Sequence, residues 1–294
     1  MRRTTTLTLL LLAGTGLAQP QEPSRVTIIY DAMGVPSELE RDWGFAALVE
    51  YNGRRILFDT GNDAEILRRN VERLGLDLSH LDAAVISHRH GDHTSGLSYL
   101  LEVNPAIRIY TPLEGAFFAR GPLPEGFLVP DPDVPPDMRY FGGHVPEELN
   151  DRRSYIWDAD FVTVTGTTEV FPGFYLLTTR SEKPGMRDMN EVSLAVRTPR
   201  GLAMIVGCSH PGIETILEEA ARIDTRIYTA IGGFHLVRTP RSDIQATATT
   251  LHDMFKLDRV APAHCTSEPG FAVFMDRFGD RYDRAGVGSV IDLP

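Results

Sequence analysis

The sequence predicts an α/β fold in which sheets and helices form a layered sandwich. Apolar runs rich in β-branched residues alternate along the chain with segments of helical periodicity, the pattern of α/β architectures. The 294 residues suffice for one large domain or two small ones. A hydrophobic content of 42% and a charged content of 23% are ordinary for a globular enzyme.

Residues 1–18 predict a secretory signal peptide. Met1-Arg2-Arg3 is basic, residues 7–12 are all leucine or threonine, and Gly16-Leu17-Ala18 offers the small residues that a signal peptidase recognises. The apolar run is short for a membrane span, which leaves an uncleaved anchor as the lesser alternative. We therefore expect export to the periplasm or medium, a linker to about residue 24, and no stable membrane anchor after cleavage.

One domain is expected over residues 25–294, and its strands follow from short apolar runs. Asn52-Gly53 predicts a hairpin turn, because this dipeptide favours the backbone angles of two-residue turns. Strands are predicted at 25–30, 45–50, 55–58, 83–86, 107–110, 161–164, 174–177, 191–198, 201–206, 227–231, 259–261 and 286–293. Helices are predicted at 62–74, with Asn62 as N-cap, and at 92–101, 214–223, 242–255 and 269–278.

An irregular insertion interrupts this pattern at about residues 112–160. Six prolines break regular structure there: Pro122, Pro124, Pro130, Pro132, Pro135 and Pro136. Aromatic residues recur beside them: Phe117, Phe118, Phe127, Tyr140 and Phe141. A long irregular segment in a compact domain is commonly a lid or binding loop, and the aromatics favour a cover over a partly apolar substrate. A disordered surface insertion is the alternative.

The strongest chemical signal is the run His88-Arg89-His90-Gly91-Asp92-His93, which directly follows an apolar strand. His88 and His90 are two residues apart, so in an extended segment they point the same way. Asp92 and His93 enter the next helix and approach the same space from another direction. Imidazole and carboxylate together suit zinc, iron or manganese. This spacing predicts a metal site.

The motif His88-x-His90-x-Asp92-His93 resembles the signature of the metallo-β-lactamase superfamily, whose members are mostly two-metal hydrolases. The resemblance implies an αβ/βα four-layer sandwich, with two mixed sheets face to face, helices outside and metals at one edge. It also implies a supporting aspartate after an earlier strand, which Asp59 matches. That residue would hold the metal loop by hydrogen bonding without binding the metal; a simple turn aspartate is the alternative.

Three further histidines complete the expected site. His80, His144 and His252 are explained by solvent or packing, whereas His210, His235 and His264 each follow an apolar strand. The blocks Gly-Cys-Ser-His, Gly-Gly-Phe-His and Pro-Ala-His-Cys resemble the subgroup of dihydropterin-ribofuranosylaminobenzene-phosphate synthase. That resemblance implies two metal sets, which are His88, His90 and His210 for one ion and Asp92, His93 and His264 for the other.

The chain departs from commoner superfamily members at Cys208, which stands where those members have a bridging aspartate. Cys208 and Cys265 are the only cysteines, and each adjoins a presumed ligand or its loop. In an exported protein a disulfide is the default. Free thiols that support the site are equally compatible with the sequence, and direct ligation by the Cys208 thiolate is a weaker third alternative.

These observations predict a metal-dependent hydrolase that acts on an ester, phosphoester, lactone or amide of a small molecule. Two divalent cations, with zinc favoured, would lower the pKa of a shared water to about 7 and provide hydroxide. Asp92 would orient this nucleophile and His235 would donate a proton or contact the substrate. An iron-dependent redox enzyme and a non-catalytic binder are the alternatives. The net charge of −11 argues against a nucleic-acid partner; the oligomeric state is left open.

Overall fold

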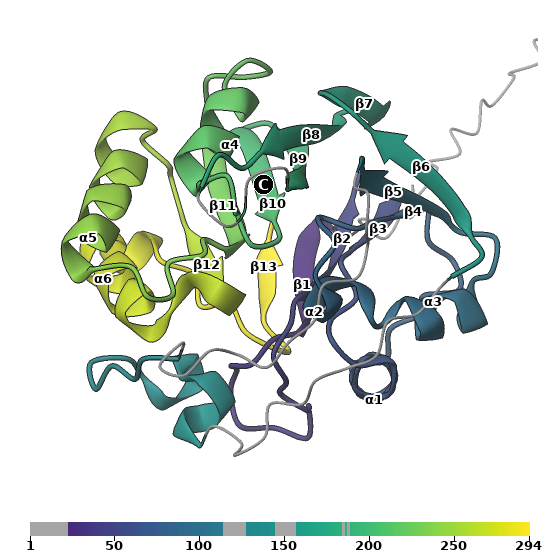
Figure 1. Cartoon of the computed structure of the whole chain (residues 1–294), viewed down its shortest axis with the longest axis horizontal. Coiled ribbons are helices and arrows are strands. Elements are labelled where there is room, and N and C mark those ends of the chain that lie inside the picture. The colour runs from purple at the N-terminus through teal and green to yellow at the C-terminus, as the bar shows by residue number, and fades with distance from the viewer. Residues whose placement is uncertain (1–22, 114–127, 145–156, 184–185, 187–188) are drawn as a thin grey trace, which may run out of the picture.

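A computed structural model of the chain describes residues 23–113, 128–144, 157–183, 186 and 189–294, which form two mixed sheets flanked by helices (Figure 1). The predicted signal peptide, residues 1–18, lies outside the described residues, as do Phe117, Phe118 and Phe127 of the insertion. No helix in the described part of the chain is both long and apolar enough to cross a membrane.

The first sheet has seven strands in the order β13-β1-β2-β3-β4-β5-β6. In that order the strands are Val290–Asp292, Arg25–Tyr30, Ala46–Tyr51, Arg54–Phe58, Ala83–Val85, Arg108–Pro112 and Asp160–Val164. Strands β3 to β6 run parallel, whereas β13, β1, β2 and β3 pair antiparallel. The predicted Asn52-Gly53 hairpin joins β2 to β3.

The second sheet has six strands in the order β12-β11-β10-β9-β8-β7. They span Ala261–Ala263, Ile227–Gly233, Gly201–Val206, Asn190–Thr198, Phe174–Arg180 and Thr168–Phe171. Strands β10, β11 and β12 are parallel and the others antiparallel. Strand β7 was not predicted, because its four residues are exposed or half-buried and show no clear apolar pattern.

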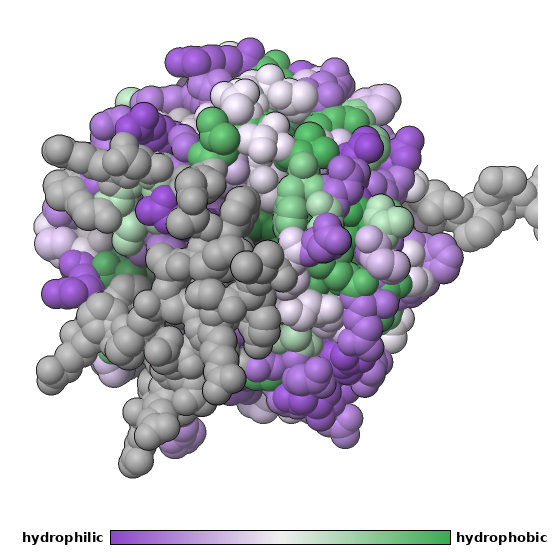
Figure 2. All heavy atoms as spheres, turned by 45° about the vertical axis from the view of Figure 1, so that its right-hand side comes forward, coloured by the Kyte–Doolittle hydropathy of each residue, from purple (hydrophilic) through white to green (hydrophobic). Residues whose placement is uncertain are grey.

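Helices cover the outer face of each sheet. The first sheet carries α1 (Ala64–Arg73) and α3 (Leu97–Val103), and the second carries α4 (Ile213–Ala220), α5 (Arg241–Thr249) and α6 (Glu268–Phe278). The short helix α2 (Gly91–Thr94) lies between β4 and α3 in the chain. A π-helical turn at Thr250–Met254 extends α5, and short 3-10 helices lie at Pro136–Met138, Tyr140–Gly143, His264–Thr266 and Gly279–Arg281. Hydrophilic side chains gather at the lower right of the face in Figure 2.

Three apolar clusters separate these layers. The largest lies between the sheets and contains residues of both, such as Phe58 and Ile205. A second packs the other face of β10 and β11 against α4, α5 and α6, with Leu217 at its contact. A third packs the other face of β1 to β4 against α1 and α3, with Leu67 and Leu100 buried. Each sheet is thus apolar on both faces, which is the reason for four layers.

Two of the differences from the predicted helices have a clear physical cause. Asp63, not Asn62, caps α1, because its side chain accepts hydrogen bonds from the amides of Glu65 and Ile66. The predicted helix at 92–101 is two helices, α2 and α3, separated around Gly96. A Cβ atom at Gly96 would lie 2.0 Å from the Thr60 carbonyl oxygen, so this chain crossing requires glycine.

The described part of the insertion, residues 128–144, packs against the domain. Tyr140 is fully buried, with its ring 5.4 Å from that of Trp43, and its hydroxyl donates a hydrogen bond to the His264 carbonyl oxygen. The Tyr140 amide donates to Glu268 of α6 at 3.2 Å. The expectation that this aromatic covers a substrate is therefore wrong for Tyr140, because its ring completes the interior behind His264. The other predicted aromatic here, Phe141, is half-buried.

Candidate metal centre

The predicted site residues follow the carboxyl ends of strands, and the fold brings these ends together. Asp59 follows β3, residues 87–93 follow β4, and the loop at 208–210 follows β10. His235 and His264 come directly after β11 and β12. The two sheets nearly touch here, since a Cβ atom on Gly207 would lie 2.2 Å from Ser87 Oγ. Loops far apart in sequence therefore share one space.

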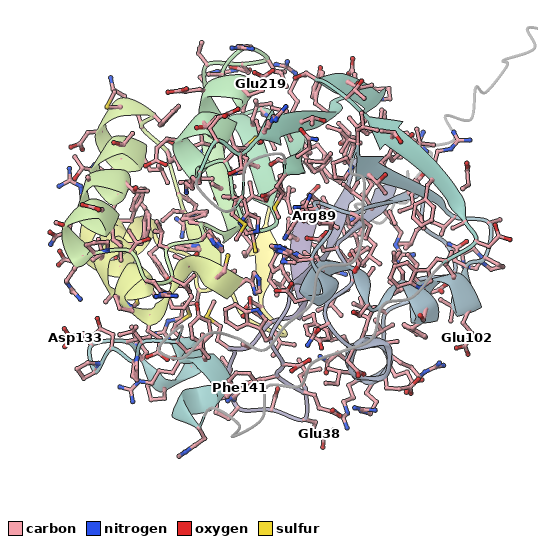
Figure 3. All side chains as sticks on the ribbon, in the orientation of Figure 1. Glu38, Arg89, Glu102, Asp133, Phe141 and Glu219 are labelled. Atoms are coloured by element: carbon pink, nitrogen blue, oxygen red, sulfur yellow. The ribbon has the colours of Figure 1, made fainter. Side chains whose placement is uncertain are left out.

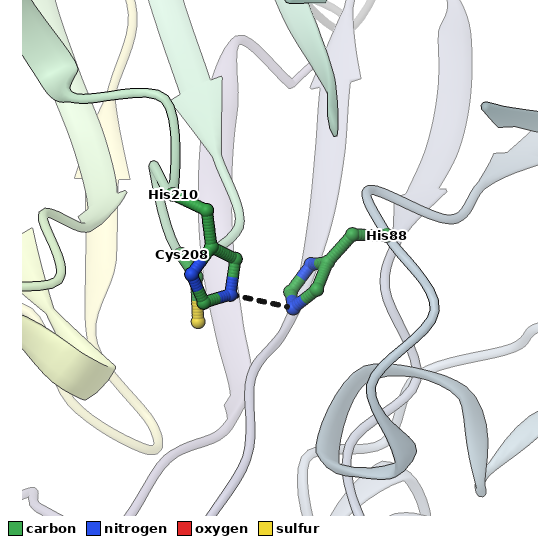
Figure 4. A group of neighbouring side chains, drawn as sticks. All are labelled: His88, Cys208 and His210. Carbon is green, nitrogen blue, oxygen red and sulfur yellow. Dashed lines mark hydrogen bonds between the residues drawn. The ribbon is translucent and has the colours of Figure 1, made fainter. Parts of the chain in front are cut away.

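His88, His90 and His210 form the first group. His88 Nε2 lies 3.1 Å from His90 Nδ1 and 3.3 Å from His210 Nε2. Figure 4 shows His88 and His210 pointing at each other from opposite halves of the molecule, with Cys208 beside them. His88 Nδ1 contacts Ser87 Oγ at 2.9 Å, which leaves Nε2 directed at the other histidines.

Asp92, His93 and His264 form the second group. His93 Nε2 lies 3.2 Å from His264 Nε2, and Asp92 Oδ2 lies 3.3 Å from the same His264 atom and 3.7 Å from His93 Nε2. His93 and His264 are fully buried, and the Trp43 ring packs 4.7 Å from the His264 ring. His264 has a left-handed backbone, with φ of 46°. Such strain in a non-glycine residue is typical of functional sites.

Cys208 lies between the two groups. Its sulfur is 3.3 Å from His93 Nε2, and it belongs to a set of potential metal ligands with His88 and His210 and to another with His93 and His264. Cys208 and Cys265 are free thiols whose sulfur atoms are 3.3 Å apart, beyond the roughly 2.05 Å of a disulfide bond. The disulfide alternative is not seen in this structure.

The donor atoms suit divalent metal ions. Two imidazole Nε2 atoms that face each other at 3.2 or 3.3 Å must have a shared cation or proton between them, because lone pairs alone repel. Burial lowers the pKa of His88 and of His210 well below its ordinary value, and lowers the pKa of His90 to about 4. Neutral imidazole is the form that binds metal. This group of histidines is therefore prepared for a cation.

The second group balances charge differently. Burial opposes a charge on His93, but Asp92 and Asp59 outweigh it and raise the pKa of His93 to about 9. Burial likewise opposes ionisation of Asp92, yet His93 and His264 hold the pKa of that carboxyl below its ordinary value. The first group consists of neutral imidazoles, whereas the second pairs a protonated imidazole with a carboxylate. A metal ion that binds the second group would therefore displace protons from its histidines.

Asp59 makes three hydrogen bonds to the loop that carries the histidine motif. It is fully buried, and its carboxylate accepts hydrogen bonds from the Ser87 amide, the Ser87 hydroxyl and His93 Nδ1, each at 2.7 Å. Because a carboxylate can only accept, His93 carries a proton on Nδ1 and directs Nε2 toward the centre. The simple-turn interpretation does not account for these three contacts.

The solvent side of the centre contains His90, Asp92 and His235, which are half-buried. The His235 ring lies 4.2 Å from the His210 ring at an interplanar angle of 57°, and a ring nitrogen of His235 lies within 4.8 Å of the Cys208 and Cys265 sulfur atoms. Arg89 lies in the same central region of the molecule (Figure 3). His80 and His252 instead pair with Asp77 and Asp253 away from this region, and the structure brings His144 into no donor set among the described residues.

Two buried carboxylates at the site were not predicted. Glu191 of β9 accepts hydrogen bonds from the amides at 208–210, and Asp31 accepts one from the His264 amide at 3.0 Å. Burial raises the pKa of Glu191 to about 7 and that of Asp31 to about 7. An acidic residue inside the apolar predicted strand at 191–198 was the available signal for Glu191. Asp31 directly follows a strand and could have been noticed in the same way.

The chain is similar in sequence to a known family and to curated proteins. Residues 43–176, which include Asp59 and the His88–His93 motif, match the model of the Metallo-beta-lactamase superfamily. A 7,8-dihydropterin-6-methyl-4-(beta-D-ribofuranosyl)-aminobenzene-5'-phosphate synthase of Methanocaldococcus jannaschii is 28% identical over 90% of this chain and 95% of its own. An uncharacterised protein of the same organism is 30% identical over 76% of this chain and 83% of its own.

A solved structure described as a metal-dependent hydrolase of the beta-lactamase superfamily is also similar. It superimposes with a TM-score of 0.69 and 25% identity, and the match covers 92% of this chain and 99% of that one. The family model matches residues 43–176, whereas the similarity to this structure covers 92% of the chain and so includes the strands before His210 and His264. On the grounds of motif, facing sheets and relatives, the chain belongs to the metallo-beta-lactamase superfamily.

Proposed function

We propose that this protein is a metal-dependent hydrolase that cleaves an ester or phosphoester bond in a small molecule. The observation that carries the proposal is the convergence of six histidine and aspartate donors in two groups around Cys208. His88, His90 and His210 would hold one divalent cation, and Asp92, His93 and His264 a second, with zinc favoured over iron or manganese. The family supports a hydrolase in general, since its structures include metal-dependent hydrolases.

When bound, such cations would lower the pKa of a water molecule to about 7 and would stabilise negative charge on a carbonyl or phosphoryl oxygen. The chain itself provides orientation and proton transfer. Asp92 is the carboxylate on the solvent side, so it can align an attacking water by accepting a hydrogen bond. His235 faces the same side and can give a proton from its imidazole to the leaving oxygen as the ester bond breaks.

The substrate approaches from the half-buried side formed by His90, Asp92 and His235, because the other four histidines of the cluster are buried. Arg89 adds a positive charge beside His90, where it lowers the pKa of that imidazole as a minor contribution after burial. A positive charge at this edge favours an anionic substrate, such as a phosphoester. The relative named as a 5'-phosphate synthase supports this preference for an anionic, phosphate-containing substrate. The test below therefore includes phosphodiesters.

Metal analysis of protein purified without added metal tests the proposal first. We expect up to two divalent ions per chain and hydrolysis of p-nitrophenyl esters or phosphodiesters that a chelator abolishes. His88→Ala and His264→Ala should each lose metal, whereas His80→Ala, at an exposed histidine paired with Asp77, should not. Unchanged metal stoichiometry in both site variants would contradict the assignment. A coloured protein rich in iron that hydrolyses nothing would favour redox chemistry instead.

A further inference from the structure

The loop at 208–210 carries two potential metal ligands, and a single side chain from another strand holds its backbone. Glu191 Oε1 accepts hydrogen bonds from the amides of Cys208 at 3.0 Å and Ser209 at 2.7 Å. Glu191 Oε2 accepts a third from the His210 amide at 2.8 Å. All four residues are buried, so water does not replace these contacts. One carboxylate therefore satisfies three consecutive backbone donors.

This contact holds a strained conformation. Ser209 has a φ of 60°, a left-handed backbone that a serine rarely adopts. Its hydroxyl is also fixed, since it donates to the Gly233 carbonyl oxygen at 2.7 Å. The turn directs Cys208 and His210 toward the same space although they are separated by only one residue. Without an acceptor for its three amides, such a turn would leave buried donors unsatisfied, at roughly 1–3 kcal/mol each.

The same segment of β9 also contacts the other half of the site. The amide of Val192, next to Glu191, donates to the Ser87 carbonyl oxygen at 2.8 Å. Ser87 precedes His88 and contacts Asp59, so its position determines where the histidine motif begins. Residues 191 and 192 thus connect the loop with Cys208 and His210 to the loop with His88 and His93. A displacement of Glu191 would change the spacing between the two loops.

We propose that Glu191 is a positioning residue of the metal centre. Its carboxylate accepts from the three amides at 208–210 and so holds this backbone with Cys208 and His210 facing the metal-binding space. This inference rests on the proposed function, since it concerns the affinity of the same centre for cations. It differs from the assignment of ligands, because Glu191 contacts backbone amides and touches no donor atom of the two groups.

The test measures metal affinity and uses no substrate. Glu191→Gln keeps the size of the side chain but removes its charge and turns one oxygen into an NH₂ group that faces a backbone N–H. We expect Zn²⁺ and Co²⁺ to bind roughly 10- to 100-fold more weakly in competition with a chelator, the usual loss when a supporting contact is removed. Glu191→Asp keeps the charge but is one methylene shorter, so we expect an intermediate loss.

The control is Glu50→Gln, which neutralises another buried carboxylate. Glu50 lies in β2, is 6% exposed and pairs with Arg25 and Arg55 away from the centre. We expect this variant to lower the thermal midpoint and to keep wild-type metal affinity. Selective loss of affinity in the Glu191 variants, with the control unchanged, supports the positioning role.

Wild-type affinity in either soluble Glu191 variant would overturn the inference, as would equal losses of affinity in Glu191→Gln and Glu50→Gln. If Glu191→Gln does not fold, Glu191→Asp decides the question by the same measurement. A wild-type protein that binds metal and hydrolyses nothing would overturn the hydrolase proposal alone, because metal affinity is measured independently. A wild-type protein that binds no metal would overturn both.

Discussion

The replacement Asp59→Asn tests how the fold prepares His93 for a cation. An asparagine can still accept the hydrogen bond from the Ser87 amide through its oxygen, as Asp59 does at 2.7 Å. Its NH₂ group then stands where Asp59 Oδ2 accepted from His93 Nδ1. Because this NH₂ group donates, Nδ1 must become an acceptor, and in the neutral form of His93 that binds metal the single proton moves to Nε2. The nitrogen that faces His264 and Cys208 is then blocked.

The magnitude follows from the contacts that change. Asp59 is fully buried and its Oδ2 also accepts from the Ser87 hydroxyl, so the mismatch that the NH₂ group creates with this hydroxyl costs about 1–3 kcal/mol of folding free energy. Loss of a carboxylate that orients a metal-binding histidine usually weakens metal binding roughly 10- to 100-fold. At about 1.4 kcal/mol for each factor of ten, that loss corresponds to about 1.4–2.8 kcal/mol of binding free energy. We therefore expect the variant to fold, to be less stable and to bind Zn²⁺ more weakly.

The assay is a chelator competition with Zn²⁺, combined with thermal unfolding of the metal-free protein. Asp77→Asn is a matched control, because Asp77 accepts from a serine amide, a serine hydroxyl and a histidine in the same way as Asp59. Asp77 lies at the surface, so its replacement should leave both readouts almost unchanged. Wild-type Zn²⁺ affinity in Asp59→Asn would refute the argument about the His93 proton.

Three further predictions concern stability and processing. Gly96→Ala places a Cβ atom 2.0 Å from a backbone carbonyl oxygen, so the thermal midpoint should fall sharply or the protein should fail to fold. In the control Gly166→Ala the new Cβ has nothing within 4 Å, and the midpoint should stay at the wild-type value. Ile205→Ala opens a cavity between the sheets and should cost about 2–5 kcal/mol in denaturant unfolding, against about 0.5 kcal/mol or less for Met254→Ala at a side chain that is 75% exposed. Similar unfolding free energies for these two would contradict the assigned core. Finally, N-terminal sequencing of protein from a periplasmic fraction should show that residues 1–18 have been removed; retention of Met1 there would contradict cleavage, and absence of the protein from that fraction would contradict export.

Much of the fold was predictable because strand and helix patterns are local. The hairpin around Asn52-Gly53 and the strand pair β9–β10 follow from turn residues and apolar runs that lie close together in the sequence. The need for glycine at position 96 was not predictable, since it comes from the Thr60 carbonyl oxygen, which belongs to a loop more than thirty residues away. Tyr140 was misassigned for a similar reason, because only packing against Trp43 and His264 reveals its burial.

The sequence by itself determined the local chemistry of the site. The spacing of His88, His90, Asp92 and His93 after a buried strand already predicts a metal-binding turn, because backbone geometry alone directs these side chains to one region. The positions of His210 and His264 at strand ends followed from the same local reasoning.

Only the tertiary structure decided how these turns meet. It brings Cys208 between the two groups of donors, keeps it 3.3 Å from Cys265 as a free thiol, and holds its loop on the carboxylate of Glu191. These relations depend on how closely two separate sheets approach, which the contact between Gly207 and Ser87 sets. The distance between the sheets depends on how side chains pack throughout the interior, so it cannot be predicted from any short stretch of sequence.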